Sequence, residues 1–208
     1  LIYKKLISDE LEELESILNE SVSSEIELAT EVSKHLVSSG GKRIRPAICI
    51  LVAKCLNYKG KDLTRLASSI ELLHTATLIH DDVVDQSLMR RGKESIQVKW
   101  DNAHGVLVGD FVYSKAFQLM ASFDNPEIIR TLANATNRIS EGEVLQLSLK
   151  NKGELSKEEY FEIIDRETAE LFKVSAITAG ILCACNKDQL ISLSNFSASL
   201  GIAFQIQD

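Results

Sequence analysis

Three aspartates stand within five residues in the segment HTATLIHDDVVDQSLMRRG (residues 74–92), and two arginines follow them. On a helix, Asp81 and Asp85 lie one turn apart, so their carboxylates share a face. Carboxylates this close repel each other unless a cation lies between them, and paired hard oxygens suit Mg²⁺ shared with substrate phosphates. Arg90 and Arg91 add permanent cations that can face the same anion. The spacing therefore predicts a magnesium-dependent phosphate site, with a solvated acidic helix end as the alternative.

A second concentration of charge is the sequence GGKRIRP at residues 40–46. Pro46 predicts the start of a helix, which puts Lys42, Arg43 and Arg45 at the positive end of the helix dipole, where cations are unfavourable. A bound anion relieves that conflict, and a glycine turn beside a helix amino end suits a diphosphate. A solvated basic loop is the alternative that this segment, taken by itself, leaves open.

The helix that leads to the aspartates is apolar on the side beneath them. Counting back from Asp81, that stripe contains Thr77, Ala76, Leu73 and Ile70. The two charged segments then predict two diphosphate anchors, one through metal and one direct, on either side of an apolar channel. Such a site suits ionisation of an allylic carbon–oxygen bond, because the leaving diphosphate must be neutralised while water is kept from the carbocation.

The elements that position these groups are predicted to be helices. The chain has 208 residues, only two prolines and ten glycines, and its apolar residues recur at helical spacing almost throughout, which indicates an all-α protein. Helix starts are marked by possible capping boxes at Ser24–Glu27 and Ser156–Glu159 and by a cap at Asn125–Pro126. We expect helices near residues 3–20, 24–39, 46–57, 62–87, 104–123, 126–149, 156–185 and 187–208.

Composition excludes several classes of protein. A net charge of −7 argues against a nucleic-acid partner, because a surface that follows phosphates needs excess Lys and Arg. The longest uncharged apolar run, Val174–Cys185, is too short to span a bilayer, and the acidic amino end is no signal peptide. The four cysteines, Cys49, Cys55, Cys183 and Cys185, lack metal-site spacing, so we expect buried thiols in a reducing cytoplasm. The chain starts at Leu1 and stops at FQIQD inside a predicted helix, so we expect a truncated carboxyl end.

Seven motifs stand in the order in which trans-prenyl diphosphate synthases carry them. They are GGKRIRP (40–46), LLHTATLIHDDVVD (72–85), RRGKES (90–95), VLVGDFVYSKAFQLM (106–120), EGEVLQL (141–147), ETAELF (167–172) and FQIQD (204–208). The chain resembles this family over nearly its whole length, and most closely the bacterial members that make octaprenyl diphosphate for the ubiquinone tail. The resemblance implies one domain over residues 1–208, an isoprenoid-synthase-type bundle of long helices around a central apolar cavity, and a homodimer.

The resemblance also implies a reaction and a role for each matching residue. An allylic diphosphate, with farnesyl diphosphate as the expected primer, ionises and is attacked by isopentenyl diphosphate, and a proton is then lost. The expected roles are isopentenyl diphosphate binding by Lys42, Arg45, His74 and Arg91, allylic diphosphate binding by Arg90, Thr168 and Gln205, and Mg²⁺ binding by Asp81, Asp85 and Asp208. The long product implies contact with a membrane surface on release, without a transmembrane segment.

Product length is predicted from the path that the growing chain follows. Short-chain members of the family place an aromatic residue about one turn below the first aspartate, whereas this chain has Ala76 and Thr77 there. The path from Asp81 back to Ile70 is about 16 Å of helix, so long products are expected. The predicted tunnel residues are Ile70, Leu73, Ala76, Thr77 and Met120, with Phe117 as a second candidate for its floor.

Two departures from the family pattern leave alternatives open. Glu167, preceded by Arg166, stands where the family usually has the lysine of KTAxLF, and the second aspartate-rich motif begins at Asp208 without being completed. A carboxylate beside a diphosphate is repulsive, so a non-catalytic partner subunit of an active synthase is the second hypothesis. A terpene cyclase is the third hypothesis. It fits the sequence less well, because a cyclase does not need the second diphosphate-binding segment GGKRIRP.

Overall fold

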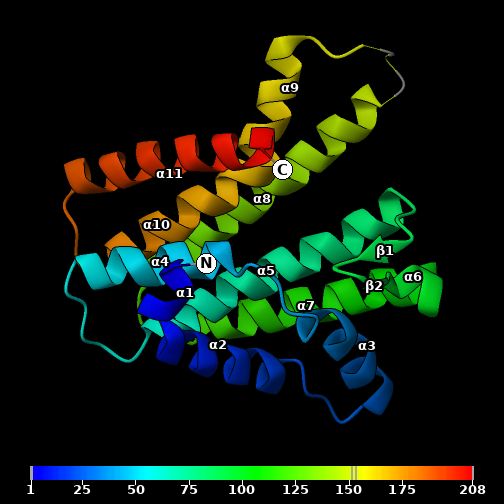
Figure 1. The fold of residues 1–208 in the computed structure, drawn as a ribbon, viewed down its shortest axis with the longest axis horizontal. Helices are drawn as coiled ribbons and strands as arrows, with labels where there is room; N and C mark the ends of the chain where they lie inside the picture. Colours follow the sequence, from blue (N-terminus) through cyan, green and yellow to red (C-terminus); the bar gives the residue numbers. More distant parts are fainter. Residues whose placement is uncertain (1, 151, 153, 208) are drawn as a thin grey trace. The chain divides into compact units, whose positions relative to one another are not determined.

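The computed structural model describes residues 2–150, 152 and 154–207, and almost all of its regular structure is helical (Figure 1). The predicted all-α class is therefore confirmed. Contacts divide the chain into two compact units, Leu1–Ile50 with Gly60–Ser122, and Leu51–Lys59 with Phe123–Asp208. The single domain expected from the sequence stays a prediction.

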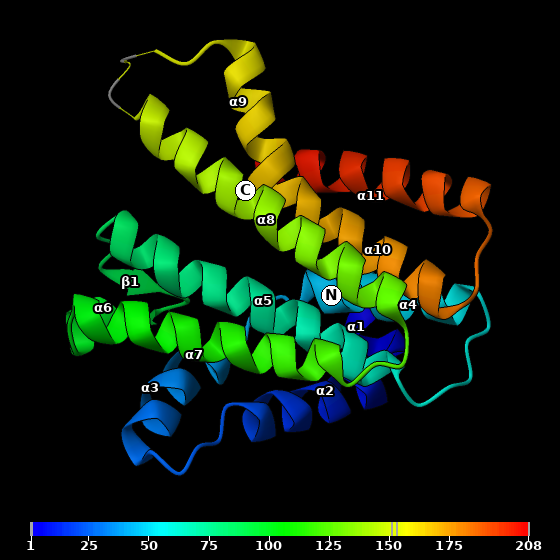
Figure 2. The ribbon, with the colours of Figure 1, turned by 180° about the vertical axis from the view of Figure 1, so that it is seen from behind.

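The first unit is organised around the long helix that ends at the aspartates. Its elements are α1 (Ile2–Leu6), α2 (Ser8–Ser21), α3 (Glu27–Val37), the start of α4 (Ile44–Cys55), α5 (Leu63–Val84), β1 (Met89–Arg90), β2 (Lys93–Glu94), α6 (Ile96–Lys99) and α7 (Asn102–Ala121). Helix α5 runs beside α7 and packs on α2, as both views of the ribbon show (Figures 1 and 2). Most of α5 is buried, so its apolar sequence reflects a central position in this unit.

Two glycines on α7 allow the aspartate end of α5 to approach closely. A Cβ at Gly105 would lie 2.4 Å from Val83 Cγ2, and one at Gly109 would lie 2.2 Å from His80 Nε2. These distances are shorter than any ordinary contact, so larger residues would push the helices apart. The last turn of α5 is thereby held against a second helix.

The second unit contains α8 (Pro126–Leu149), α9 (Lys157–Ile164), the π-helix η1 (Asp165–Ala169), α10 (Glu170–Leu182) and α11 (Lys187–Gln207). Helix α10 packs on α8 and α11 (Figure 2), and the buried ring of Phe172 lies 5.4 Å from that of Phe204. A Cβ at Gly201 would lie 2.7 Å from Ala169 Cα. Helix α11 therefore passes close to the backbone of η1, which fixes the irregular turn in place.

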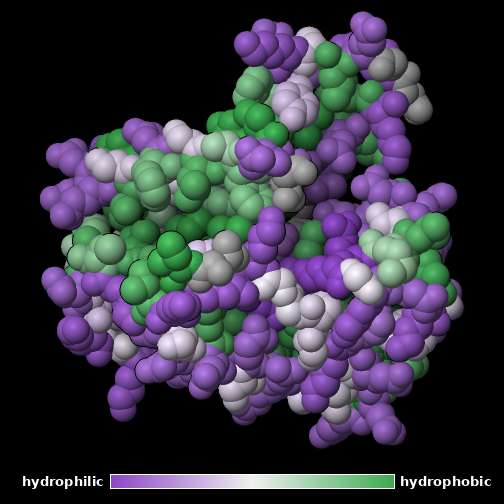
Figure 3. All heavy atoms as spheres, in the orientation of Figure 1, coloured by the Kyte–Doolittle hydropathy of each residue, from purple (hydrophilic) through white to green (hydrophobic). Residues whose placement is uncertain are grey.

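Some apolar side chains remain on the surface. Ile191, Phe196 and Leu200 are 37–60% exposed, and Figure 3 shows hydrophobic side chains gathered over α11. Among the described residues, none of the helices combines the length and hydropathy that crossing a membrane requires.

The expectation that the four cysteines are buried is correct for Cys49 and wrong for the other three. Cys55 is exposed, and Cys183 and Cys185 are partly exposed, because they lie at or just after the ends of helices α4 and α10.

Two of the three predicted helix starts are confirmed, because the predicted cap side chain accepts a hydrogen bond from a backbone N–H of the first helical turn. Ser156 and Glu159 form a capping box at α9, and Asn125 accepts from the Glu127 N–H at the start of α8. The capping box expected at Ser24–Glu27 is wrong. Helix α3 is preceded by Ile26, and the Ser24 hydroxyl oxygen instead accepts from the Ile26 N–H in a turn before the helix.

Other boundaries differ because tertiary contacts decide them. The helix expected over 3–20 is two helices, divided at the fully buried Ile7. Helix α4 begins at Ile44 rather than at Pro46, so Arg45 lies inside its first turn. The segment 89–99 forms a hairpin and the short helix α6, neither of which was expected, and the helix expected over 156–185 is interrupted by η1.

Candidate active site

The loop Gly40–Arg43 joins α3 to α4 through an unusual run of backbone angles. The φ angles are positive at Gly40 (72°), Gly41 (134°) and Arg43 (52°). The φ angle of Gly41 favours glycine, and a Cβ there would lie 3.2 Å from Arg91 Cζ, which is tighter than most real contacts. The expected glycine turn is present, and the side chain of Arg91 lies against it.

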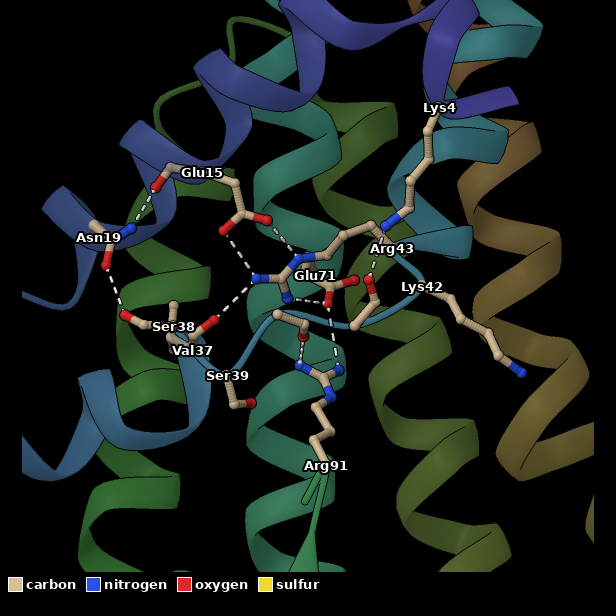
Figure 4. A network of polar contacts seen from close by, with 12 residues as sticks. Lys4, Glu15, Asn19, Val37, Ser38, Ser39, Lys42, Arg43, Glu71 and Arg91 are labelled. Carbon is tan, nitrogen blue, oxygen red and sulfur yellow. Dashed lines mark hydrogen bonds and ion pairs between the residues drawn. The ribbon is translucent and has the colours of Figure 1, made fainter. Parts of the chain in front are cut away.

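Three successive carbonyl groups of this loop accept hydrogen bonds from side chains far away in sequence. Arg91 Nη1 donates to the Gly40 oxygen (2.6 Å), Lys4 Nζ to the Gly41 oxygen (3.1 Å) and Tyr3 Oη to the Lys42 oxygen (2.5 Å). Figure 4 shows Lys4 and Arg91 reaching the loop from α1 and from the hairpin. The loop is therefore fixed by contacts from both sides.

Arg43 points inward, although the sequence groups it with the basic side chains of an anion seat. It donates to Glu15 Oε1 and Oε2 (2.7 and 2.9 Å), to Glu71 Oε1 (2.6 Å) and to the Val37 carbonyl (2.9 Å) (Figure 4). The two carboxylates raise the pKa of Arg43 despite its burial. Arg43 is thus a buried structural cation, and the expectation that it faces an anion is corrected, since its donors are engaged inside the unit.

Arg45 and His74, both predicted to bind isopentenyl diphosphate, lie in contact. Arg45 Nη1 is 3.0 Å from His74 Nε2. A guanidinium only donates, so Nε2 accepts and the ring proton is on Nδ1. Burial lowers the pKa of His74 well below its usual range, and nearby arginines, first Arg45 and then Arg91, lower it further. His74 is therefore a neutral histidine beside several cations.

His74 gives a pH-dependent prediction. Its pKa in the folded chain is below its ordinary value of 6.5, so the unfolded chain binds more protons as the pH falls below 6.5. The free energy of unfolding should therefore fall in acid with a slope of up to about 1.4 kcal/mol per pH unit from this group. His74→Gln should flatten the slope in urea titrations between pH 5 and 7. An unchanged slope would contradict the burial of a neutral ring.

The three aspartates at the end of α5 divide into two groups. Asp82 is buried and accepts from Arg90 Nε (2.9 Å) and Nη2 (2.5 Å), which ties β1 to α5. This hydrogen bond, and the charges of Asp82, Asp81 and Asp85, raise the pKa of Arg90. Asp81 is partly exposed and Asp85 is exposed. The pair that the spacing selected is thus the pair that solvent reaches, while the middle aspartate is structural.

The paired aspartates fit a magnesium ion that shares its coordination with a substrate. Asp85 caps the helix, its N–H donating to the Asp81 carbonyl (2.8 Å), so the two residues are one turn apart. Within residues 2–150, 152 and 154–207, no group of three or more His, Cys, Asp or Glu side chains is placed to hold a metal. Two carboxylates with remaining positions for water and phosphate oxygens are the usual protein share of an Mg²⁺ site. Asp208, the third predicted ligand, lies outside the described residues.

The remaining residues expected on the isopentenyl side and along the tunnel also lie in the first unit. Lys42 is exposed, and its side chain extends away from Arg43 and Arg91 (Figure 4). The predicted tunnel residues with at most 2% exposure are Ile70, Leu73, Ala76 and Met120; Thr77 is partly exposed and bonds to the His74 carbonyl (2.8 Å), and Phe117 is 42% exposed. The tunnel itself stays a prediction.

In the second unit, the two residues expected on the allylic side meet. Thr168 Oγ1 donates to Gln205 Oε1 (2.9 Å), which joins η1 to α11. A π-helix adds one residue per turn and often marks a functional site, and here it carries Thr168 toward α11. Nothing in the spacing of DRETA indicates this irregularity, so it could not be predicted from the residues alone.

Glu167 and its neighbour Arg166 lie in a polar cluster between α8 and η1. Arg166 donates to Glu141 (2.8 Å) and to Glu162 (3.0 Å). With its amide nitrogen turned toward η1, Gln146 donates to Glu167 Oε2 (2.9 Å). Compensation of Glu167 by Arg166 is therefore limited, because that guanidinium is engaged by two other carboxylates.

Sequence reasoning missed Glu71 and Asp82 as parts of the site. Glu71 is 1% exposed, bonds to Arg43, and lies 3.5 Å from Arg91 Nη2. A signal for it was present, because Glu71 stands one turn before His74 in an otherwise apolar helix. A charge on a buried stripe needs a partner of opposite charge, and the basic segments on either side supply it.

Comparison with known proteins identifies the family of the chain. The polyprenyl synthetase family model matches residues 26–208. Octaprenyl diphosphate synthase of Escherichia coli (strain K12) is 40% identical over 204 residues, covering 98% of this chain and 63% of that protein. The crystal structure of a decaprenyl diphosphate synthase from Rhodobacter capsulatus superimposes with a TM-score of 0.93 at 38% identity, covering 98% of this chain and 63% of that one.

A second solved structure carries ligands. Polyprenyl synthase from Caulobacter crescentus CB15, complexed with calcium and isoprenyl diphosphate, superimposes with a TM-score of 0.94 at 34% identity, covering 98% of this chain and 62% of that one. The chain thus spans a little under two thirds of the length of these relatives. The match over residues 26–208, with the relatives' identity across nearly all of this sequence, shows that the chain belongs to the polyprenyl synthetase family.

Proposed function

We propose that the protein is a magnesium-dependent prenyltransferase that condenses isopentenyl diphosphate with an allylic diphosphate to a long, about octaprenyl, product. The observation that carries this proposal is the contact of Arg45 with His74, close to Arg91, in the unit that also contains the paired Asp81 and Asp85. One anchor is cationic and the other is anionic. Two diphosphates can then be bound in different ways, one directly and one through a divalent ion.

The residues of the direct anchor have distinct tasks. Arg45 and Arg91 supply guanidinium charge to phosphate oxygens. Exposed Lys42 adds a point charge at the edge of the loop. His74, kept neutral, can donate its Nδ1 proton without adding charge. Together they hold isopentenyl diphosphate with its double bond ready to attack.

The metal anchor serves the leaving group. Asp81 and Asp85 would bind Mg²⁺, which neutralises negative charge on the allylic diphosphate as the carbon–oxygen bond breaks. Arg90, held by Asp82, keeps a fixed cation beside the same pair. In the second unit, Thr168 Oγ1 donates to Gln205 Oε1, and these two residues stay predicted to bind the allylic diphosphate. The apolar wall of α5 keeps water from the carbocation.

A turnover assay tests this proposal. The full-length protein is incubated with isopentenyl diphosphate, farnesyl diphosphate and Mg²⁺, and the products are separated by chromatography after removal of the diphosphate. A Mg²⁺-dependent series that ends near eight isoprene units supports the proposal. An active metal site with no elongated product, or no release of diphosphate at all, would count against it.

Product length gives a sharper prediction at Ala76. This side chain is fully buried on α5, one turn before the aspartates. If the growing chain passes here, Ala76→Tyr should stop elongation early and shift the product to a few isoprene units, while the first condensation continues. An unchanged product length, measured with a variant that still turns over, would contradict the direction of the tunnel.

Glu167 favours a second candidate function, a silent subunit that supports an active partner. Its carboxylate accepts from Gln146 and belongs to the residue just before Thr168, so a diphosphate bound by Thr168 would meet a negative charge nearby. The discriminating experiment compares the purified protein alone with its Glu167→Lys variant. Turnover by the unmodified protein rules this candidate out, whereas turnover by the variant only would establish it.

The remaining features follow from the proposed reaction. A hydrophobic product of this length is suited to the side chain of a membrane quinone, and its release would take place at a membrane surface by a peripheral contact. We propose a cytoplasmic enzyme that works as a homodimer. Sedimentation of the full-length protein tests the dimer directly.

A further inference from the structure

Helix α1 is attached to the first unit in an unusual way. It has five residues, none of them buried, and its apolar side chains Ile2 and Leu6 are 83% and 64% exposed. A helix of this length is unstable by itself and gains little here from apolar burial. Two of its polar side chains, however, bond to the loop Gly40–Arg43.

The two contacts of α1 are hydrogen bonds to backbone carbonyl groups of the loop. Tyr3 Oη and Lys4 Nζ are adjacent donors that bond to adjacent carbonyl oxygens, those of Lys42 and Gly41. Arg91 bonds to the next one, of Gly40. Burial raises the pKa of Tyr3, so its hydroxyl remains a donor at neutral pH. Each carbonyl of the three residues therefore has its own donor from outside the loop.

Occupied carbonyl groups matter in a loop that receives an anion. A carbonyl oxygen carries partial negative charge, so a free one facing a diphosphate would repel it. Donors that hold the oxygens also fix the peptide planes, which in this loop adopt three positive φ angles that most residues avoid. Binding is then stronger, because less conformational freedom is lost when the ligand arrives.

We propose that Tyr3 and Lys4 are positioning residues, through which α1 holds the loop Gly40–Arg43 in the conformation that binds the diphosphate of isopentenyl diphosphate. The inference rests on the proposed function of that loop. It assigns to a short, exposed helix a role in substrate affinity. It also predicts linkage, since a ligand that prefers the ordered loop must strengthen the attachment of α1.

The test uses the full-length protein with paired variants. Tyr3→Phe removes one hydroxyl, and Lys4→Met removes one ammonium while keeping its chain length. Lys5→Met, on the same exposed helix, loses the same charge and is the matched control for general electrostatic attraction. Lys4→Arg keeps a cationic donor and should restore function. The readouts are the dissociation constant of isopentenyl diphosphate by calorimetry, KM and kcat, and hydrogen exchange of residues 40–43.

The expected effect is a weaker affinity for one substrate. Losing each hydrogen bond should raise the dissociation constant and KM for isopentenyl diphosphate by about threefold to tenfold. The kcat, the KM for the allylic substrate and the thermal midpoint should stay close to those of Lys5→Met, and exchange of the loop amides should be faster.

Two failures can be told apart. If the unmodified protein does not bind isopentenyl diphosphate, the proposed function fails. If it binds, and Tyr3→Phe and Lys4→Met match Lys5→Met in affinity and loop exchange, the inference alone is overturned. Equal losses of affinity for both substrates would also overturn it, because positioning of this loop should affect only one.

Discussion

Replacing Asp81 with asparagine is expected to lower kcat by about 10²- to 10³-fold, the largest effect on activity that the structure predicts. An amide removes one of two charged ligands, so Mg²⁺ is held less tightly where the leaving diphosphate needs it. The same substitution should slightly increase the free energy of unfolding. Asp81 and Asp85 are like charges one turn apart, so neutralising one should stabilise the helix by a few tenths of a kcal/mol, roughly.

The controls for this prediction lie on the same helix. Asp62→Asn changes a partly exposed aspartate at the other end of α5, paired with Arg65 at 2.8 Å, and should leave kcat unchanged. Asp82→Asn breaks the buried pair with Arg90 and should cost stability. Steady-state kinetics over a range of Mg²⁺ concentrations, with urea unfolding of each variant, separates the three residues. Full activity of Asp81→Asn would contradict the metal assignment.

Replacing Arg43 with methionine is expected to have the largest effect on stability, a loss of about 3–5 kcal/mol. The substitution leaves the carboxylate of Glu71, which is 1% exposed, without its 2.6 Å partner. The other nearby cation, Arg91 Nη2, is 3.5 Å away. For a chain of this size the thermal midpoint should fall by about 10 °C. Differential scanning calorimetry or urea unfolding measures it.

The neighbouring residue provides a matched control. Lys42→Met removes an exposed cation one position earlier, so stability should change by less than about 0.5 kcal/mol, while affinity for isopentenyl diphosphate falls. Adding Glu71→Gln to Arg43→Met should recover part of the lost stability, because a neutral amide costs less to bury than an unpaired carboxylate. Equal stability of the two methionine variants would show that Arg43 does not have a buried structural role.

The helices were predictable because each long one carries its own periodic pattern. Helix α5 shows its buried stripe in sequence, and Ser156 and Asn125 cap their helices by bonds to residues at most three positions away. The hairpin at Met89–Glu94 was not predictable in this way. Its two-residue strands are too short for alternation, and a contact of Arg90 with Asp82 eight residues earlier supports it. The π-helix η1 likewise packs closely against Gly201 of α11, a residue more than 30 positions later in the chain.

The residues of the candidate site likewise fall into a predictable group, close together in sequence, and an unpredictable group that only folding brings together. Charged residues at helical spacing, such as Asp81 and Asp85, could be recognised from sequence because the helix itself brings them together. Glu71, Tyr3 and Lys4 reach their partners across 28 to 39 positions of chain, so only the folded unit joins them. Arg43 is the clearest example of a residue whose role could not be predicted from sequence. It stands between Lys42 and Arg45 in one basic segment, yet a positive φ angle turns it into the interior, where it pairs with Glu15 and Glu71.

Two diphosphates are proposed to bind at separate anchors, one without metal and one through it. The sharpest test is a calorimetric titration of the full-length protein with isopentenyl diphosphate in the presence of a metal chelator. Metal-free binding should be observed, should survive Asp81→Asn and should be weakened by Lys42→Met. Binding that appears only when Mg²⁺ is added, or that is lost with Asp81, would contradict this proposal.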